Sequence, residues 1–245
     1  MLAGRTILLT GAARGLGAEI ARSLASHGAK LFIADVAEEE GRATAQDVGA
    51  EFFPVDLGNP DSILELAAQL SKATGGTLDG LINNGAIATG IGGIAFDEIE
   101  LDSWDRVMRV NVRGTWLMTR AVAPLLRASG SGRVVNVASD TALWGAPMLM
   151  SYVASKGAVL SMTRSLAREL GPDQVGVVAV APGILTTEST EYVPEQRHAH
   201  YEQGRAVPGP QGPEDITDVI AFLLTQGALT LTGQVLPVNN GFVFK

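Results

Sequence analysis

Short apolar runs alternate with longer segments of helical periodicity along the whole chain. The runs at residues 5–10, 30–35 and 132–139 each precede a longer stretch with helical spacing. Within the runs, apolar residues follow one another without polar alternation, which is typical of parallel strands covered on both faces. This order predicts the α/β fold class, as a single-domain Rossmann-type doubly wound parallel sheet of about seven strands with helices on both faces. No linker or repeat interrupts the pattern, so residues 1–245 are expected to form one domain.

The remaining elements follow the same rhythm until residue 184. Residues 184–212 are polar and rich in proline, so we expect them to form a substrate lid within the domain. The other strands are expected at 51–56, 78–84, 175–181 and 234–239, and the clearest helices at 16–27, 102–126 and 151–170.

Charge and composition exclude several classes of partner. Lys and Arg number 18 against 26 Asp and Glu, a net charge of −8 that repels a phosphate backbone, so no nucleic acid partner is expected. The chain has no cysteine, which excludes thiolate zinc sites and suits a reducing cytoplasm. No signal peptide is recognisable, and the apolar run from Val175 is interrupted by Pro182 and too short for a bilayer. No membrane partner is expected.

A glycine-rich loop, TGAARGLG at residues 10–17, lies where the first strand turns into the first helix. Glycines at 11, 15 and 17 let the backbone turn sharply and approach a pyrophosphate, which a helix N-terminus stabilises. The spacing is T-G-x-x-x-G-x-G rather than the common dinucleotide fingerprint. A loop of this kind is also found in turns without any ligand. Its position after the first strand favours a dinucleotide site.

The acidic residue that closes the second strand is Asp35. A carboxylate at this place accepts hydrogen bonds from the adenosine ribose and repels a 2′-phosphate, which favours NAD over NADP. Arg14 argues in the other direction, because a guanidinium can pair with that phosphate. We expect the cofactor to be NAD.

Tyr152 and Lys156 stand four residues apart, so in a helix they share one face. In an arbitrary helix such a pair lies on the surface. In a cleft, however, the ammonium could lower the phenol pKa from about 10 to about 7, which requires about 4 kcal/mol. A charge about 4 Å away contributes that much at an effective dielectric constant near ~20. The pair could therefore exchange a proton with an alcohol.

Several motifs, taken in order along nearly the whole chain, resemble those of the short-chain dehydrogenase/reductase family. Each motif alone is weak, and the complete set is far more specific. They are the loop at 10–17, Asp56-Leu57, Asn83-Asn84, Asn111 in VNVRG, Ser139 placed 13 residues before Tyr152, YVASK (152–156), Pro182-Gly183 with Thr187, and TGQVLPVNNG (232–241).

The resemblance implies an enzyme that moves a hydride between a nicotinamide cofactor and a CH–OH group. Tyr152 would be the general acid and base, and Ser139 would donate to the substrate oxygen. Lys156 would hold the nicotinamide ribose and lower the phenol pKa, and Asn111 would bind a water that links Lys156 to solvent. The implied cofactor-binding residues are Gly11, Arg14, Gly15, Leu16, Gly17, Asp35, Asp56, Leu57, Asn83, Tyr152, Lys156, Pro182, Gly183, Leu185 and Thr187.

The chain departs from the family pattern at two places. Gly85-Ala86 reverses the usual alanine and glycine. If position 86 needs positive φ, alanine there is strained by roughly 1–2 kcal/mol, so a local backbone adjustment is expected. Asn239-Asn240-Gly241 replaces a D-G-G turn, which we expect to affect a subunit contact and no catalytic group.

The substrate is expected beyond the carboxyl ends of the strands. Residues 140–150 contain no arginine, which favours a neutral, moderately hydrophobic secondary alcohol or ketone, whereas Arg197 and Arg205 in the lid leave an anionic substrate open. The histidines at 198 and 200 have no obvious third ligand, so no metal is expected. The expected substrate-binding residues are Ser139, Trp144, Met148 and Tyr152.

Two other functions are compatible with these motifs. The glycine loop with Arg14 also resembles that of NADPH-dependent 3-oxoacyl-[acyl-carrier-protein] reductases, although Asp35 and the negative charge argue against an acidic carrier. A redox sensor that binds NAD without turnover is the second, but such proteins typically lose the tyrosine or the lysine. In relatives the helices at 102–126 and 151–170 form subunit contacts, so a homotetramer is expected.

Tyr152→Phe is expected to bind cofactor and to lose nearly all turnover, because the variant keeps the ring and removes the proton that is exchanged. Cofactor titration by fluorescence and steady-state rates measure the two properties separately. Full activity in this variant would contradict the assignment.

Overall fold

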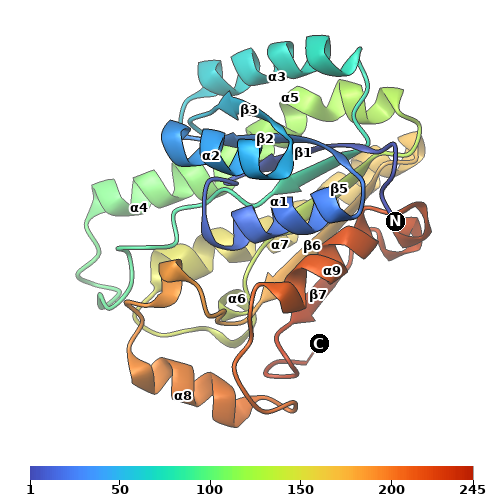
Figure 1. The fold of residues 1–245 in the computed structure, drawn as a ribbon. Helices are drawn as coiled ribbons and strands as arrows, with labels where there is room; N and C mark the ends of the chain where they lie inside the picture. Colours follow the sequence, from blue (N-terminus) through green and yellow to red (C-terminus); the bar gives the residue numbers. More distant parts are fainter. Residues whose placement is uncertain (245) are drawn as a thin grey trace.

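Seven parallel strands form one sheet in the order β3-β2-β1-β4-β5-β6-β7. The computed structural model describes residues 1–244, except for the side chain of Ser189. The chain crosses over between β3 and β4, so the sheet is wound in two directions from β1 (Figure 1). The strands are β1 Thr6–Thr10, β2 Lys30–Asp35, β3 Glu51–Pro54, β4 Gly80–Asn83, β5 Arg133–Val137, β6 Gly176–Pro182 and β7 Val235–Val238.

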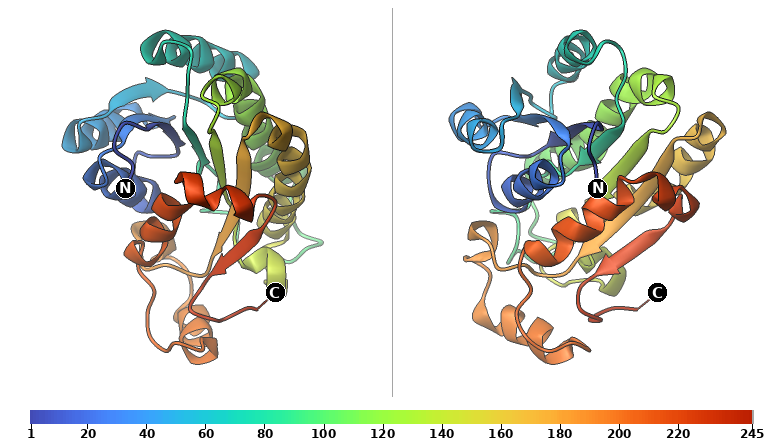
Figure 2. Two further views of the ribbon diagram at one scale, coloured as in Figure 1. Left: turned by 90° about the vertical axis from the view of Figure 1, so that its right-hand side faces the viewer. Right: turned by 45° about the vertical axis from the view of Figure 1, so that its right-hand side comes forward.

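Helices cover both faces of the sheet, which confirms the predicted fold class (Figures 1 and 2). On one face, α1 and α9 pack against each other, and α2 joins them beside β2 and β3. On the other face, α3, α5 and α7 lie side by side. The helices are α1 Gly15–Ser26, α2 Glu38–Val48, α3 Pro60–Thr74, α5 Thr115–Ala128, α7 Met150–Leu170 and α9 Glu214–Leu223.

The two helical layers explain why the strand sequences lack polar alternation. Successive side chains of a strand point to opposite faces, so in β1 Leu9 joins the core beneath α1 and α9 while Leu8 joins the core beneath α3 and α5. All residues of β5 and β6 are buried. Burial of both faces favours apolar residues at nearly every position, and the buried polar residues of β5, Arg133 and Asn136, make hydrogen bonds.

The long helix expected at 102–126 is divided into three parts. The chain forms α4 (Leu101–Val107), a π-helical segment (Met108–Gly114) and then α5. The prediction of one uninterrupted α-helix was therefore wrong in detail. Gly114 packs closely on the loop after β3, so that a Cβ at this position would lie 2.6 Å from the carbonyl oxygen of Leu57. Asn111 lies inside the π-helical segment, a feature common at functional sites.

The segment at 184–212 contains helix α8 (Glu195–Gly204), which the sequence pattern did not predict. Tyr201 is its one buried residue, so no apolar stripe marks the helix in the sequence. It lies at the bottom of Figure 1, on the side of the sheet toward which the arrows of β6 and β7 point. The short elements are α6 Thr141–Trp144 and the 3₁₀ helices Gly171–Asp173, Glu188–Thr190 and Gln226–Leu231. Within residues 1–244, no helix has the length and apolarity needed to cross a membrane.

The loops that follow the neighbouring strands β1 and β4 touch through glycine. A Cβ on Gly11 would overlap the Cα of Gly85, and a Cβ on Gly85 would lie 2.8 Å from Cδ1 of Leu57 and 3.2 Å from the amide of Gly11. Ala86 does not have positive φ, so the expected strain at this position is absent. The glycine is required at position 85 because two backbones meet there, and position 86 has no such requirement.

Gly85→Ala is expected to lower the free energy of unfolding by about 1–3 kcal/mol, because the added methyl group overpacks the contact with Leu57 and Gly11. Ala86→Gly is the matched control and should lose less than about 1 kcal/mol, mainly through chain entropy. Urea denaturation of both variants measures the difference. Equal stability of the two variants would show that the glycine contact is unimportant.

Candidate active site

A cavity of about 1290 Å³ opens along the carboxyl ends of the strands. Ligands of doubly wound sheets bind at this edge, where the winding direction changes. Most residues that the sequence nominated lie in its wall. These are Gly11, Arg14, Gly15, Leu16, Gly17, Asp35, Asp56, Leu57, Ser139, Met148, Tyr152, Lys156, Pro182, Gly183, Leu185 and Thr187.

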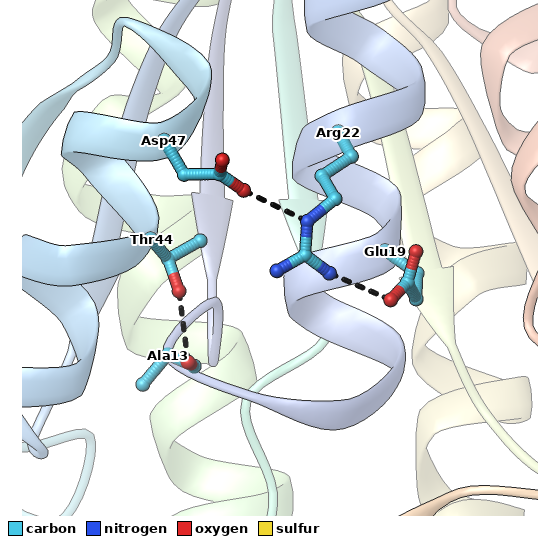
Figure 3. Close-up of polar contacts among 5 residues, drawn as sticks. All are labelled: Ala13, Glu19, Arg22, Thr44 and Asp47. Carbon is cyan, nitrogen blue, oxygen red and sulfur yellow. Dashed lines mark hydrogen bonds and ion pairs between the residues drawn. The ribbon is translucent and has the colours of Figure 1, made fainter.

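The glycine loop is held in place from β2 and α2. The carboxylate of Asp35 accepts hydrogen bonds from the amide of Ala13 at 2.9 Å and from the amide of Ala37 at 3.0 Å. From α2, the hydroxyl of Thr44 donates to the carbonyl of the same residue, Ala13, at 2.9 Å (Figure 3). Asp35 therefore has two structural partners, and its carboxylate still borders the cavity.

An ion-pair group fixes the two helices that flank this loop. Arg22 of α1 donates to Asp47 of α2 at 2.9 Å and to Glu19 of its own helix at 2.6 Å (Figure 3). All three side chains are about half exposed, so the energetic contribution is small, and the main consequence is a defined spacing between α1 and α2.

The cradle formed by the glycine loop fits a dinucleotide diphosphate. A Cβ on Gly17 would overlap the carbonyl oxygen of Gly11, and the side chain of Asn84 donates to this same oxygen at 2.8 Å. The loop thus has no room for a side chain at Gly11 or Gly17. The first turn of α1 then presents unpaired amides to the cavity, which is the arrangement that binds phosphate.

Asn83 does not line the cavity, although it was nominated as a cofactor-binding residue. Its amide donates to Thr119 at 2.9 Å and to Asn136 at 2.8 Å, and Asn136 in turn donates to Thr163 at 2.9 Å. These buried side chains connect β4 and β5 to α5 and α7. Asn83 is therefore a structural residue, whereas the following Asn84 faces the cavity.

Tyr152 and Lys156 share one face of α7, as the spacing predicted. The ammonium of Lys156 lies 5.5 Å from the centroid of the Tyr152 ring and donates to the carbonyl of Val137 at 2.8 Å. Lys156 is 4% exposed, and both residues border the cavity. The hydrogen bond connects α7 to the end of β5, two residues before Ser139.

The pKa values of this pair differ from the expectation. Burial raises the pKa of Tyr152 to about 12, and a hydrogen bond with Ser139 offsets only part of that effect. Burial also lowers the pKa of Lys156 to about 8. The predicted depression of the phenol pKa by Lys156 is not observed, because the loss of solvent raises this pKa more than the hydrogen bond with Ser139 lowers it.

Ser139 and Asn111 approach the pair from two other elements. Ser139 follows β5 and accepts a hydrogen bond from the hydroxyl of Thr141 at 2.9 Å. Asn111 lies behind the cavity wall rather than in it. Its side-chain oxygen accepts the backbone amide of Ile87 at 2.7 Å. Its side-chain nitrogen donates to the carbonyl of Ile87 at 3.0 Å and to the hydroxyl of Ser155 at 3.1 Å. Asn111 thereby joins the loop after β4 to the helix of Tyr152.

Trp144 does not line the cavity, in contrast to its nomination as a substrate-binding residue. Its indole donates to the hydroxyl of Tyr201 at 3.1 Å and packs against His200 and Phe242. The cavity wall instead includes Tyr201, which sequence reasoning missed because α8 has no apolar periodicity.

The segment at 184–212 contributes further groups, one of which, Tyr192, the sequence did not assign. Tyr192 lines the cavity and donates to the carbonyl of Ala88 at 2.8 Å, across the cavity mouth. Arg197 also lines the cavity and donates to the carbonyl of Pro147 at 3.1 Å. Arg205 is buried and bonds the carbonyls of Ile184 and Gly209, so it is not available to a substrate in this structure.

Comparison with known proteins extends these observations. The family model described as "Enoyl-(Acyl carrier protein) reductase" matches residues 11–243. A 3-alpha-(or 20-beta)-hydroxysteroid dehydrogenase of Mycobacterium bovis is 32% identical, covering 99% of this chain and 90% of the relative. A sorbitol dehydrogenase of Cereibacter sphaeroides is 35% identical, covering 98% of both chains.

A solved structure shows the same arrangement of the whole chain. The 3-ketoacyl-(acyl-carrier-protein) reductase of Brucella melitensis, crystallised with NADH, superimposes with a TM-score of 0.91 at 31% identity and covers 100% of both chains. The motifs, the fold and these relatives agree over nearly the full length. The chain belongs to the short-chain dehydrogenase/reductase family.

Proposed function

We propose that the protein uses NAD to exchange a hydride with a neutral secondary alcohol or its ketone, with Tyr152 as general acid and base. Membership in the family makes the protein an oxidoreductase of CH–OH groups that uses a nicotinamide cofactor. The observation that supports the finer proposal is the continuous cavity. It runs from Asp35 and the glycine loop to Ser139 and Tyr152.

The proposed chemistry assigns one task to each polar side chain. The cofactor, when bound, accepts or supplies the hydride. Tyr152, with its pKa near 12, is protonated at neutral pH and can donate its proton to a carbonyl oxygen. Ser139 stabilises charge on the same oxygen. In the oxidative direction Tyr152 must lose a proton, and the nearby ammonium of Lys156 is the group that favours this ionisation.

Asn111 is proposed to support proton movement behind Lys156. Both hydrogens of its side-chain amide are used by Ile87 and Ser155, which leaves one lone pair on Oδ1 for a water molecule. Such a water would connect Lys156 with solvent and renew the proton on Tyr152.

The preference for NAD rests on the position of Asp35. Its two oxygens each accept one backbone amide and retain lone pairs toward the cavity, where they can accept ribose hydroxyls. The charge would repel a 2′-phosphate. Arg14 also lines the cavity, but it is exposed, so solvent weakens any interaction with that phosphate.

The substrate end of the cavity is mainly apolar. Met148, Leu149, Ile184 and Val193 line it together with Tyr192. This wall supports the proposal of a moderately hydrophobic alcohol or ketone. Arg197 lies in the same wall, so a substrate that carries a carboxylate away from its hydroxyl group belongs in any screen.

A 3-oxoacyl-[acyl-carrier-protein] reductase is the second candidate, because the Brucella melitensis enzyme of that name has the same fold over the whole chain. The net charge of −8 argues against an acidic carrier protein. A sensor without turnover is disfavoured by the convergence of Tyr152, Lys156 and Ser139 on one cavity.

We further propose that the chain is one domain with residues 184–212 as its lid, and that it works as a cytoplasmic homotetramer. The lid bonds across the cavity mouth through Tyr192 and Arg197. Leu101 of α4 and Trp116 of α5 are 79% and 44% exposed, which leaves apolar surface for a subunit contact. The mass in solution, measured by light scattering, tests the assembly.

A panel of secondary alcohols and ketones tests the proposed reaction directly. The relatives justify including steroid alcohols and polyols, and the cavity justifies alicyclic and carboxylate-bearing alcohols. Absorbance of the reduced nicotinamide reports turnover, with acyl thioesters of carrier protein as a separate arm. Turnover limited to the thioester arm would replace the proposal with the second candidate, and no turnover with any compound would contradict both.

Asp35→Asn is expected to lower kcat/KM for NAD by about tenfold or more and to raise the ratio of NADP to NAD efficiency, because the variant removes the charge and keeps the shape. Asp173→Asn, which changes a carboxylate paired with Arg127 outside the cavity, is the matched control. Side-by-side rates with both cofactors measure the ratio. An unchanged ratio in Asp35→Asn would assign the preference to another residue.

A further inference from the structure

The residue after Ser139 is a fully buried carboxylate that the proposed chemistry does not use. Asp140 is 0% exposed, and its backbone amide donates to the carbonyl of Pro182 at 3.0 Å. No ion pair of the described residues involves Asp140. A buried, unpaired carboxylate costs stability when ionised, so its presence beside Ser139 calls for a functional explanation.

The two oxygens of Asp140 bind two segments that are distant in sequence. The hydroxyl of Tyr201, in α8 of the lid, donates to Oδ1 at 2.7 Å. The amide of Asn239, directly after β7, donates to Oδ2 at 3.1 Å. Asp140 therefore joins the loop after β5, the lid helix and the C-terminal turn through hydrogen bonds to one carboxylate.

Tyr201 is the buried residue through which α8 reaches Asp140. It is 2% exposed, and its ring stacks on Phe242 with 4.2 Å between centroids. Its oxygen also accepts the indole hydrogen of Trp144 at 3.1 Å. The phenol is thus both a donor to Asp140 and an acceptor from Trp144, so removal of its hydroxyl takes one hydrogen bond from each of these groups.

Asp140, Tyr201 and Asn239 also pack against the backbone of Gly183, which lines the cavity. A Cβ on Gly183 would lie 3.1 Å from Cβ of Asn239, 3.2 Å from Oδ2 of Asp140 and 3.2 Å from Cε1 of Tyr201. Gly183 has no positive φ, so close packing explains the glycine here. A shift of Asp140 or of Tyr201 would consequently move the loop that borders both cofactor and substrate.

We infer that Asp140, Tyr201 and Asn239 form a latch that closes the lid helix over the substrate and holds Ser139 in its working position. Asp140 is a positioning residue in this arrangement, since it acts through Ser139, Gly183 and α8. The inference goes beyond the proposed reaction, because it concerns how the substrate compartment is closed and not which alcohol occupies it. Asn239, in the turn for which the sequence suggested an effect on a subunit contact, lies against Asp140.

Ionisation of Asp140 should tune the latch. Burial raises the pKa of Asp140 to about 6, and the hydrogen bonds from Tyr201 and Asn239 offset part of this effect. The charged and titratable groups that face it are Tyr201 and Arg205 of the lid and Tyr152 of α7. Burial disfavours the ionised form, so the latch should be firm below the pKa and weaker as the pH rises through about 6.

Hydrogen exchange of the α8 backbone and steady-state kinetics test the latch together. Tyr201→Phe and Asp140→Ala are each expected to speed exchange in residues 195–204 by about tenfold, because one hydrogen bond to a charged group is lost. Both should lower kcat/KM for the alcohol by about tenfold, mainly through KM, and should leave the dissociation constant of NAD within about twofold. Asp140→Asn keeps one acceptor and should retain more activity than Asp140→Ala.

The double variant Asp140→Ala/Tyr201→Phe should be no worse than the more affected single variant, since both changes open the same latch. Protection of α8 in the wild type, corrected for intrinsic exchange, should fall as the pH rises through about 6, and Asp140→Asn should show no such change. Asp79→Asn is the matched control, because Asp79 accepts from the amide of Thr6 at the opposite end of the strands.

Unchanged α8 protection in Tyr201→Phe and Asp140→Asn, or additive losses in the double variant, would overturn the latch. Equal effects of Asp79→Asn would show that general destabilisation is responsible, which also overturns it. If the wild type oxidises none of the alcohols tested, the proposed function fails while the exchange measurements still decide the latch. Tyr201→Phe and Asp140→Asn keep the test decisive if Asp140→Ala does not fold.

Discussion

The hydrogen bond between the buried ammonium of Lys156 and the carbonyl of Val137 connects the two elements on which the site depends. It joins helix α7 to the carboxyl end of β5. Because Tyr152 is one turn before Lys156 and Ser139 is two residues after Val137, this contact brings the phenol and the hydroxyl together. A charged group without solvent needs such a partner, so α7 has one stable docking position against the sheet.

Other buried polar groups gather at the same edge of the sheet and follow the same logic. Asn83 and Asn136 satisfy each other and the threonines of α5 and α7, while Asp140 binds the lid and the C-terminal turn. Satisfied polar contacts give one defined arrangement, whereas apolar packing alone tolerates several. This edge supports the proposed reacting groups, and helix α8 is bonded to it through Asp140.

The family motifs predicted which residues line the cavity best where local spacing decides their position. Tyr152 and Lys156 share a helical face, and Asp35 stands at the end of β2 beside the glycine loop. The motifs were less informative where a role depends on the direction in which a side chain points. Asn83 points into the sheet and Asn84 toward the cavity, because successive residues at a strand end face opposite sides. Trp144 likewise turns away from the cavity to bind Tyr201.

The sequence by itself determined the fold class, the succession of strands and helices along most of the chain and the elements that carry the nominated residues, since these follow from apolar periodicity and from short motifs. Only the tertiary structure decided the protonation preference of Tyr152, the place of Asn111 in a π-helical segment, and the association of Asp140 with Tyr201 and Asn239. These features arise from burial and from contacts between residues that are 61 and 99 positions apart. Neither solvent exclusion nor such long-range contact leaves a periodic signal in the chain.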